Sequence, residues 1–337
     1  MQILTNLTDS VAAETESWQQ TMRTAIRDVK TLRKQLNLPP DPTAAGAAES
    51  FALFAPLPFV DRIKPGDQSD PLLLQLLPTA AEDQSLADFS TDPLQESDAS
   101  LTTGVLKKYV GRALLIVTGA CAIHCRYCFR RHFPYSDNSA GGSDLDDALA
   151  AIAADASIEE VILSGGDPLT VVDQTLSKLI AGLESISHVR RVRIHTRLPI
   201  MIPSRVTDAL VELLKQSAME KVVVIHANHA NEFDADVANA LNRLQSAGAI
   251  LLNQTVLLKG INDDSQTLIE LSKRLLSVGV MPYYLHQLDQ VIGAAHFEVP
   301  EETGKRLIAE MRAALPGFAV PRYVREIPGE PNKTILA

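Results

Sequence analysis

The chain has 337 residues, of which 46% are hydrophobic and 21% charged, and its formal net charge is −10 at pH 7. This composition excludes a wholly disordered or collagen-like chain and leaves room for a large core. The acidic balance argues against a nucleic-acid partner, because neutralising phosphates requires a basic face. The sequence shows no secretory signal at its start, and its apolar runs are far shorter than the ~20 residues that cross a bilayer. We therefore expect a cytoplasmic protein without a membrane partner.

Residues 1–104 are expected to form a mostly helical and partly extended cap. Apolar residues at steps of three and four predict one amphipathic helix over residues 18–36. Two segments rich in small, polar, Pro or Gly residues, 41–50 and 56–70, predict linkers or extended covering segments, and a further helix is expected over residues 71–77. No motif in this cap points to a chemical function.

From Arg112 onward, short β-branched runs alternate with helical stretches, which is typical of parallel strands joined by crossover helices. The predicted strands are 113–117, 160–163, 192–195, 222–226, 250–256 and 282–286. The predicted helices are 145–154, 174–184, 206–216, 235–247, 265–276 and 302–314. Six βα units predict an α/β fold, either a partial barrel or a doubly wound sheet. In both folds the carboxyl ends of the strands form the active face.

The three cysteines of the chain, Cys121, Cys125 and Cys128, lie together in the loop after the first of these strands. An odd, clustered set excludes a complete disulfide framework and indicates a metal or catalytic site in a reducing compartment. Three thiolates can bind three irons of a 4Fe-4S cluster and leave the fourth iron open. Two other hypotheses are a zinc site completed by His124 or His132 and buried thiols that pack as small hydrophobes.

The cysteine spacing, with Tyr127 directly before the third cysteine, resembles that of the radical S-adenosylmethionine enzymes. The resemblance implies a 4Fe-4S cluster whose open iron is chelated by S-adenosylmethionine, and a six-unit βα barrel. A glycine turn after the second predicted strand is similar to the turn that meets the methionine amino group there, although alone it could be a purely structural turn. The turn consists of Ser164, Gly165, Gly166 and Asp167. His226, at the end of the fourth strand, would touch the adenosine portion, and its alternative is a hydrogen-bonded loop histidine.

From Leu106 to Lys333 the chain resembles the lysine 2,3-aminomutase family. The matching segments are 108–112, 128–131, 195–199, 253–262, 287–297 and 328–333. The short ending after Lys333 is most similar to the bacterial members that make (R)-β-lysine for the modification of elongation factor P. The resemblance therefore implies an isomerase that converts (S)-α-lysine to (R)-β-lysine by a radical mechanism.

The family also uses pyridoxal 5'-phosphate, and the resemblance implies that Lys333 forms the Schiff base with it. An amine in a desolvated pocket can lose its proton and attack an aldehyde. Lys108, Arg112 and Gln254 match positions that surround the phosphate of the coenzyme. Cations and amide donors suit such a dianion, although each of these residues alone would more often be a surface charge or a strand-end hydrogen bonder.

The substrate contacts follow from the same resemblance. Arg130 matches the arginine that holds the substrate carboxylate, while Asp289 and Glu326 match the two acids that receive the distant ammonium of lysine. Two buried carboxylates without a cation would repel each other, so the pair predicts a cationic ligand. Glu326 is one methylene longer than the aspartate usual in the larger family members.

We expect three parts: the cap over 1–104, a barrel over 105–315 and a short coenzyme-binding segment over 316–337. The expected partners are L-lysine, an electron donor such as a flavodoxin or ferredoxin system, and, through its product, the elongation factor P ligase pathway; a homo-oligomer is left open. Two alternative functions are a radical S-adenosylmethionine enzyme without pyridoxal phosphate, acting on a peptide or RNA, and a zinc-stabilised binding module.

Overall fold

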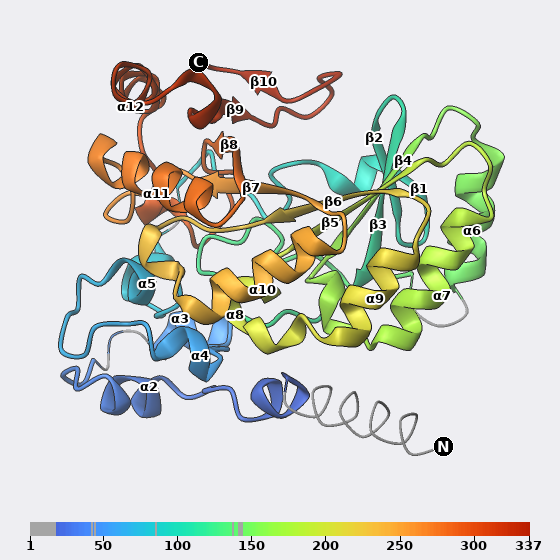
Figure 1. The fold of residues 1–337 in the computed structure, drawn as a ribbon. Helices are drawn as coiled ribbons and strands as arrows, with labels where there is room; N and C mark the ends of the chain where they lie inside the picture. Colours follow the sequence, from blue (N-terminus) through green and yellow to red (C-terminus); the bar gives the residue numbers. More distant parts are fainter. Residues whose placement is uncertain (1–17, 42, 44, 85, 137, 141–143) are drawn as a thin grey trace.

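The computed structural model describes most of the chain (Figure 1). The described ranges are 18–41, 43, 45–84, 86–136, 138–140 and 144–337. Residues 1–17 of the expected cap lie outside them.

A single sheet of ten strands runs through the molecule, with the strands in the order of the sequence. In chain order they are β1 (Ser100–Thr102), β2 (Val105–Tyr109), β3 (Arg112–Thr118), β4 (Glu160–Gly165), β5 (Arg191–Thr196), β6 (Glu220–Ile225), β7 (Ile250–Val256), β8 (Met281–His286), β9 (Arg322–Arg325) and β10 (Thr334–Ile335). Strands β3 to β9 are parallel, while β1, β2 and β10 pair antiparallel at the two ends. The six predicted strands are confirmed as β3 to β8, and within the described residues the sheet stays open because no ladder joins β1 to β10.

Each parallel strand from β3 to β8 is followed by a crossover helix, as the sequence predicts. These helices are α6 (Asp144–Ala154), α7 (Asp173–Glu184), α9 (Asp208–Gln216), α10 (Ala235–Ser246), α11 (Ser265–Ser277) and α12 (Glu301–Ala314). Side chains of Thr207, Asp234 and Asp264 cap three of them by accepting a bond from a backbone N–H of the first turn. For this reason α9 begins two residues later than its apolar pattern suggests.

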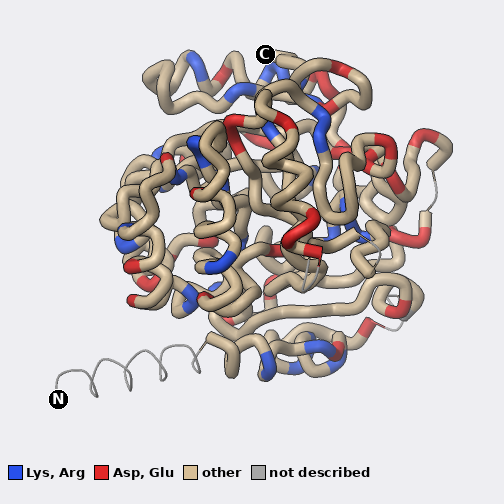
Figure 2. Tube along the Cα trace, turned by 90° about the vertical axis from the view of Figure 1, so that its right-hand side faces the viewer, with Lys and Arg blue, Asp and Glu red and all other residues tan. Residues whose placement is uncertain are grey.

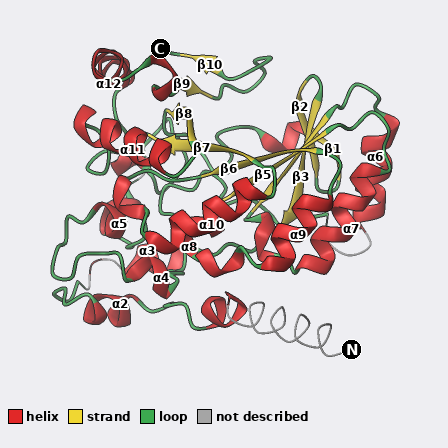
Figure 3. Cartoon of the chain, viewed as in Figure 1, coloured by secondary structure: helices red, strands yellow, loops and turns green. Residues whose placement is uncertain are grey.

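The core lies between these helices and the sheet (Figure 3). Strand residues such as Val161, Leu163 and Val223 are fully buried, and so are the inward faces of the helices, for example Leu176 and Leu241. Such alternation of polar and apolar positions along each helix fixes which side packs on the sheet. The other face of the sheet is therefore left for the site.

The helical elements outside residues 18–36 and the crossover helices are short. They are α3 (Ala45–Ser50), α4 (Leu57–Val60), α5 (Pro71–Leu74), α8 (Leu198–Met201), η2 (Ala80–Asp83), η3 (Glu96–Ala99), η4 (Pro168–Thr170), η5 (Pro203–Arg205), η6 (Ala230–Glu232), η7 (Ala295–Phe297) and η8 (Gly317–Ala319). The two predicted linkers therefore contain the helices α3 and α4, and the helix expected over 71–77 is the single turn α5. Burial explains α4, because Phe59 and Val60 pack into the core and hold a turn that periodicity could not reveal.

The single helix expected over residues 18–36 is wrong. The segment forms a helical stretch over 18–23 and a second helix, α2 (Val29–Gln35). Between them Ile26 pairs with Ala55, and each donates its N–H to the carbonyl of the other at 2.8 and 2.9 Å. An aspartate then caps the new helix, so a tertiary bridge overrides the local apolar period.

The cap is tied to the cysteine loop by buried charges. Arg126, from that loop, makes a two-pronged ion pair with Glu82 at 2.6 and 2.8 Å, and their side chains are 0% and 1% exposed. Arg131 reaches the same carboxylate at 2.9 Å. Removing one partner of such a pair leaves an uncompensated buried charge, so the cap and the loop depend on each other.

The division into parts at 104/105 and 315/316 stays a prediction, and the sheet crosses both boundaries, since β1 pairs with β2 and β8 with β9. Figure 2 shows acidic residues interspersed with basic ones over the side that it presents. Among the described helices, none combines the length and apolar character needed to cross a membrane.

Candidate active site

One large cavity, of about 610 Å³, opens at the carboxyl ends of the parallel strands and extends between them. Strand residues such as Ile162, Arg193 and Gln254 line its inner part. Every candidate site residue chosen from the sequence also lines this cavity. The structure therefore brings together segments that are more than two hundred residues apart, from Lys108 to Lys333.

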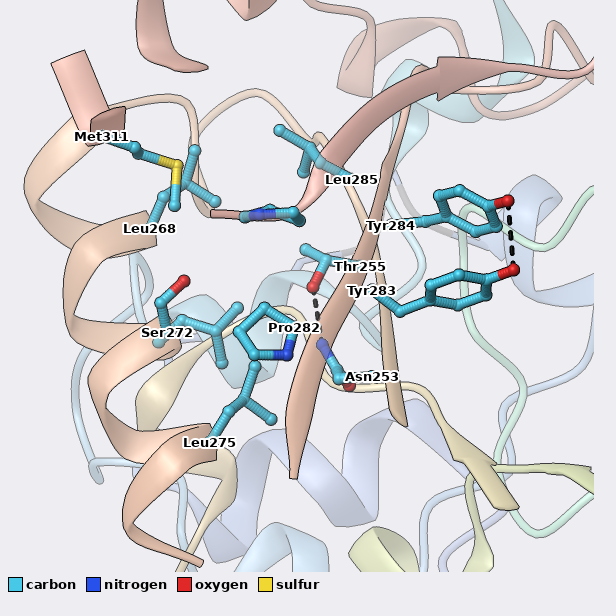
Figure 4. Close-up of a pocket in the computed structure, with 12 residues that line it drawn as sticks. Asn253, Thr255, Leu268, Ser272, Leu275, Pro282, Tyr283, Tyr284, Leu285 and Met311 are labelled. Atoms are coloured by element: carbon cyan, nitrogen blue, oxygen red, sulfur yellow. Dashed lines mark hydrogen bonds between the residues drawn. The ribbon is translucent and has the colours of Figure 1, made fainter. Parts of the chain in front are cut away.

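A second cavity is much smaller and lies between β7, β8, α11 and α12 (Figure 4). Its volume is about 10 Å³, enough for no more than one water, and apolar side chains such as Leu268 and Met311 surround it. In Figure 4 the hydroxyls of Tyr283 and Tyr284, 3.1 Å apart, lie away from Met311. We regard this space as a packing void and not as a site.

The glycine turn after β4 packs directly on the cysteine loop. The N–H groups of Gly166 and Asp167 donate to the carbonyls of Thr118 and Ala120 at 2.7 and 2.8 Å. A Cβ atom on Gly166 would lie 2.3 Å from the Ala120 oxygen, which is closer than real Cβ contacts. Glycine is therefore required here to let the two segments meet.

All three cysteines line the large cavity and are partly buried. Burial and the neighbouring thiols raise the pKa of Cys128 to about 11 and that of Cys121 well above its ordinary value. Among the described residues, no three His, Cys, Asp or Glu side chains are arranged to hold a single metal ion. A 4Fe-4S cluster has a different requirement, because each thiolate binds its own iron, and coordination deprotonates the thiol. Three thiols at one end of a cavity fit that cluster.

The two histidines considered as zinc ligands are engaged elsewhere. His124 Nδ1 lies 2.7 Å from the Ala52 carbonyl, and its ring stacks on Phe51 at 5.0 Å. His132 Nε2 lies 3.2 Å from the carbonyl of Ile292. These contacts do not favour the zinc hypothesis.

Asp167 of the glycine turn is a hub of hydrogen bonds. Its carboxylate accepts from Thr196 Oγ1 and the Arg197 N–H, both at 2.7 Å, and from the N–H groups of Leu169 and Leu198 at 3.0 and 3.2 Å. Burial raises the pKa of Asp167 to about 6, while these bonds oppose the rise. The carboxylate therefore links the end of β4 to the end of β5. A direct contact between this group and a cofactor stays a prediction.

Three histidines that line the cavity or its strands each have a buried ring nitrogen without a hydrogen-bond partner among the described residues. Within the described chain, Nε2 of His195, His226 and His286 has no hydrogen-bond partner. Burial lowers the pKa of His226 to about 4, and it also holds the pKa values of His195 and His286 well below the ordinary value, with the neighbouring His226 acting in the same direction on His195 and the Lys333 charge on His286. These rings are therefore neutral at pH 7 and can serve a bound molecule. His195 and His286 were missed, although both stand near the carboxyl ends of predicted strands.

Arg130 is held by a residue that the sequence analysis missed. Glu96, from η3, accepts from Arg130 Nε at 2.6 Å and from Nη2 at 2.8 Å. Arg130 Nη1 donates to Ser164 Oγ at 3.0 Å and approaches the Gly165 carbonyl at 3.4 Å. Burial alone would raise the pKa of Glu96, but Arg130 and Lys108 outweigh it and lower that pKa.

Lys333 meets Glu326 across the β9–β10 hairpin. Thr334 is paired with Arg325, so the next residues toward the hairpin loop, Lys333 and Glu326, lie opposite each other. Lys333 Nζ donates a hydrogen bond to Glu326 Oε2. Lys108 Nζ binds the other oxygen of Glu326 at 2.9 Å. Burial would raise the pKa of Glu326, but the two ammonium groups hold it far below its ordinary value.

Asp289 follows β8 and faces the same end of the cavity. Burial and the Glu326 charge raise the pKa of Asp289 to about 7, although Lys333 and Lys108 act in the opposite direction. A carboxyl group with a pKa near 7 is only partly ionised at neutral pH. A cationic ligand would stabilise its charged form and so lower its pKa.

The residues expected around the coenzyme phosphate come from three strands: Lys108 from β2, Arg112 from β3 and Gln254 from β7. The Arg112 guanidinium lies over the ring of Tyr109, 4.9 Å from its centre. All three line the cavity together with Lys333. The Lys333 amine fits a coenzyme that carries an aldehyde. The two cations, Lys108 and Arg112, and the amide of Gln254 fit the phosphate of the same coenzyme.

Comparison with known proteins agrees with this arrangement. A family model described as the Radical SAM superfamily matches residues 115–271. An L-lysine 2,3-aminomutase of Haemophilus influenzae is 45% identical over 331 residues, which are 98% of this chain and 98% of the relative. Another, of Escherichia coli K12, is 45% identical over 324 residues, covering 95% of this chain and 94% of the relative.

A longer relative extends the same match. An L-lysine 2,3-aminomutase of Clostridium subterminale is 36% identical over 325 residues, which are 96% of this chain and 78% of that protein. The similarity therefore includes the cap, the cysteine loop and the C-terminal hairpin. The chain belongs to the lysine 2,3-aminomutase family of radical S-adenosylmethionine enzymes.

Proposed function

We propose that this chain is an L-lysine 2,3-aminomutase, which converts (S)-α-lysine to (R)-β-lysine. The observation that carries the proposal is the single cavity that Cys121, Cys125 and Cys128 border together with Lys333. The relatives that match nearly the whole chain have the same activity in their names.

Cys121, Cys125 and Cys128 would hold a 4Fe-4S cluster, and Lys333 would hold pyridoxal 5'-phosphate, with Lys108 nearby. When bound, the cluster supplies the electron that cleaves S-adenosylmethionine, and the coenzyme carries the migrating amino group. The protein contributes geometry: it must keep the reacting carbon of lysine near the cysteine end and keep water out.

The substrate would lie between two charged ends. Asp289 and Glu326 provide the anionic end for the lysine ε-ammonium. Glu326 pairs with Lys333 and Lys108 in this structure, so the substrate ammonium would take the place of one of these cations at the Glu326 carboxylate.

Arg130 would provide the cationic end for the α-carboxylate. Its contacts with Glu96, Ser164 and Gly165 engage four of the five N–H donors of a guanidinium. A substrate carboxylate would therefore bind through the remaining Nη2 donor and displace the Nη1 contact with Ser164. Glu96 keeps the guanidinium plane fixed while this happens.

Further parts of the proposal rest on the resemblance alone. They are the flavodoxin- or ferredoxin-type electron donor and the link to elongation factor P. The cytoplasmic location rests on the apolar runs and the first residues of the sequence.

The test is anaerobic incubation of the reconstituted protein with isotopically labelled lysine, dithionite, S-adenosylmethionine and pyridoxal phosphate, followed by chiral identification of the product. We expect labelled (R)-β-lysine, and none when the coenzyme is omitted. Cleavage of S-adenosylmethionine without any change in lysine, in protein that has no coenzyme absorbance, would favour an enzyme acting on a peptide or RNA. One zinc per chain without iron or sulfide would favour a binding module.

A further inference from the structure

Arg197 is a buried arginine to which the function proposed above gives no role. It directly follows β5, and its side chain is 6% exposed. Its Nη1 atom lies 2.8 Å from the sulfur of Cys125. A guanidinium can donate hydrogen bonds but cannot accept them, so this contact is an N–H···S hydrogen bond from a charged donor.

The orientation of Arg197 is fixed on its other sides. Nη2 donates to Gln75 Oε1 and to Glu232 Oε2, the latter at 3.0 Å, and Nε donates to the His226 carbonyl at 3.2 Å. These partners come from the cap, from η6 and from the loop after β6. The guanidinium cannot turn away from Cys125 without breaking these bonds.

The charge of Arg197 is balanced on the side away from the sulfur. Glu232 is fully buried, and its other oxygen accepts from the N–H groups of Asn228 and His229 at 2.8 and 3.1 Å and from Gln75 Nε2 at 3.2 Å. This carboxylate meets the Nη2 side of Arg197, while Cys125 meets the Nη1 side. The Cys125 sulfur therefore accepts a hydrogen bond from a cationic group whose position the Glu232 carboxylate helps to fix.

A cluster bound through Cys125 gains one negative charge when a reductant supplies an electron. A fixed cationic donor at a ligand sulfur stabilises that added charge, and hydrogen bonds to the sulfurs are a known determinant of cluster potential. We propose that Arg197 is a positioning residue that orients Cys125 and raises the reduction potential of the cluster through this hydrogen bond. The inference rests on the cluster assignment of the proposed function. It also gives the cap a role, because Gln75 helps to hold Arg197.

The test compares reduction potentials in the absence of S-adenosylmethionine. Arg197→Gln alone would leave Glu232 buried without its cation, so the informative variant is the double substitution Arg197→Gln with Glu232→Gln. We expect the ratio of reduced to oxidised cluster at a fixed potential to fall about tenfold, which equals about 59 mV for a one-electron couple. Electron paramagnetic resonance during a potentiometric titration measures this ratio.

Two further variants separate the causes. Arg197→Lys keeps the positive charge but loses the planar guanidinium and its fixed donors. We therefore expect the reduction potential to fall, but by less than in the double variant. The matched control is Arg205→Gln with Asp173→Asn, which removes an ion pair of 2.7 Å between a buried arginine and a partly exposed aspartate, neither of which lines the cavity. This control should leave the potential unchanged.

A second measurement needs no substitution. Protein containing arginine labelled with ¹⁵N in its guanidino group should show a ¹⁵N hyperfine coupling to the reduced cluster. Equal potentials in the wild type and the double variant, or no such coupling, would overturn the role of Arg197 while leaving the proposed function in place. Iron and sulfide content of the wild type is measured first, and absence of a four-iron cluster there would overturn both.

Discussion

The two ends of the cavity are built in different ways. At the cysteine end, Arg126 and Glu82 lock the loop to the cap with side chains that are 0% and 1% exposed. At the other end, Lys333 is 21% exposed and stands on a two-strand hairpin whose connecting residues 327–332 are exposed. The cysteine ligands are neighbours in sequence but need distant support, whereas the Lys333 end gathers its functional groups from distant strands. Substitutions should therefore affect the two ends independently.

The largest expected effect is at the cysteine end. Cys125→Ala removes one of three cluster ligands, so we expect complete loss of S-adenosylmethionine cleavage and of the cluster absorbance. Iron content and formation of 5′-deoxyadenosine are the measurements. The matched control is His124→Gln in the same loop, which should keep both, because His124 Nδ1 meets a backbone carbonyl of the cap. Full S-adenosylmethionine cleavage activity in Cys125→Ala would refute the assignment of Cys125 as a cluster ligand.

At the other end, Lys333→Ala should abolish lysine conversion and covalent attachment of the coenzyme while leaving the iron content unchanged. Borohydride reduction followed by peptide mapping checks this, and in the wild type the label should be on Lys333. Lys108 is the nearest rival, since its amine meets the same carboxylate at 2.9 Å. A label on Lys108, or on Lys259 elsewhere in the chain, would refute the choice of Lys333.

The contact between the glycine turn and the cysteine loop offers a more indirect test. Gly166→Ala forces a Cβ to within 2.3 Å of the Ala120 oxygen, so the loop must shift and we expect most of the cluster to be lost. Gly317→Ala is the control, because a Cβ there meets nothing within 4 Å. Both proteins should be compared by iron content and thermal unfolding. Equal iron content would mean that the close approach does not position the cysteines.

Asp289→Asn should have a smaller effect that depends on pH. Losing one partner of a buried charge pair costs about 3–5 kcal/mol, and partial solvation lowers this, so we expect kcat/KM for lysine to fall at least about tenfold above pH 7. With a pKa of about 7, Asp289 is protonated below this pH and cannot pair with ammonium, so wild-type affinity should rise as pH increases through 7. The variant should lack that rise.

Glu326→Gln is the matched comparison for this pH dependence. The pKa of Glu326 is held far below its ordinary value, so Glu326 stays charged across this pH range and its loss should weaken lysine binding. Because the Glu326 charge helps to raise the pKa of Asp289, we expect the pH-dependent change to persist in this variant but to move to lower pH. Steady-state rates with lysine and norleucine over a range of pH would decide. Wild-type rates and affinities in both variants would place the two carboxylates outside the substrate site.

Much of the fold could be predicted because its patterns are local. Strands β3 to β8 and their crossover helices have apolar periods within one element, and the sequence analysis finds them all. It misses β1, β2, β9 and β10, which are two to five residues long and too short to show an apolar period of their own. It also misses the break at Ile26, because the bridge to Ala55 that causes this break is a tertiary contact.

The candidate site shows the same limit. The cysteines are visible from spacing, and the resemblance supplies Lys333, Asp289 and their neighbours. The supporting residues are invisible from the sequence, because Glu96 meets Arg130 across 34 positions and Arg197 meets Cys125 across 72. Buried partners of this kind depend on the tertiary structure alone.

The central claim is that both ends of the cavity act on one lysine molecule. The direct measurement is transfer of deuterium from C3 of labelled lysine into 5′-deoxyadenosine, in wild type and in Lys333→Ala under the same anaerobic conditions. We predict deuterium in the 5′-deoxyadenosine of the wild type and none in that of the variant, although the variant still contains its cluster. Unlabelled 5′-deoxyadenosine from the wild type, formed while (R)-β-lysine accumulates, would contradict the account.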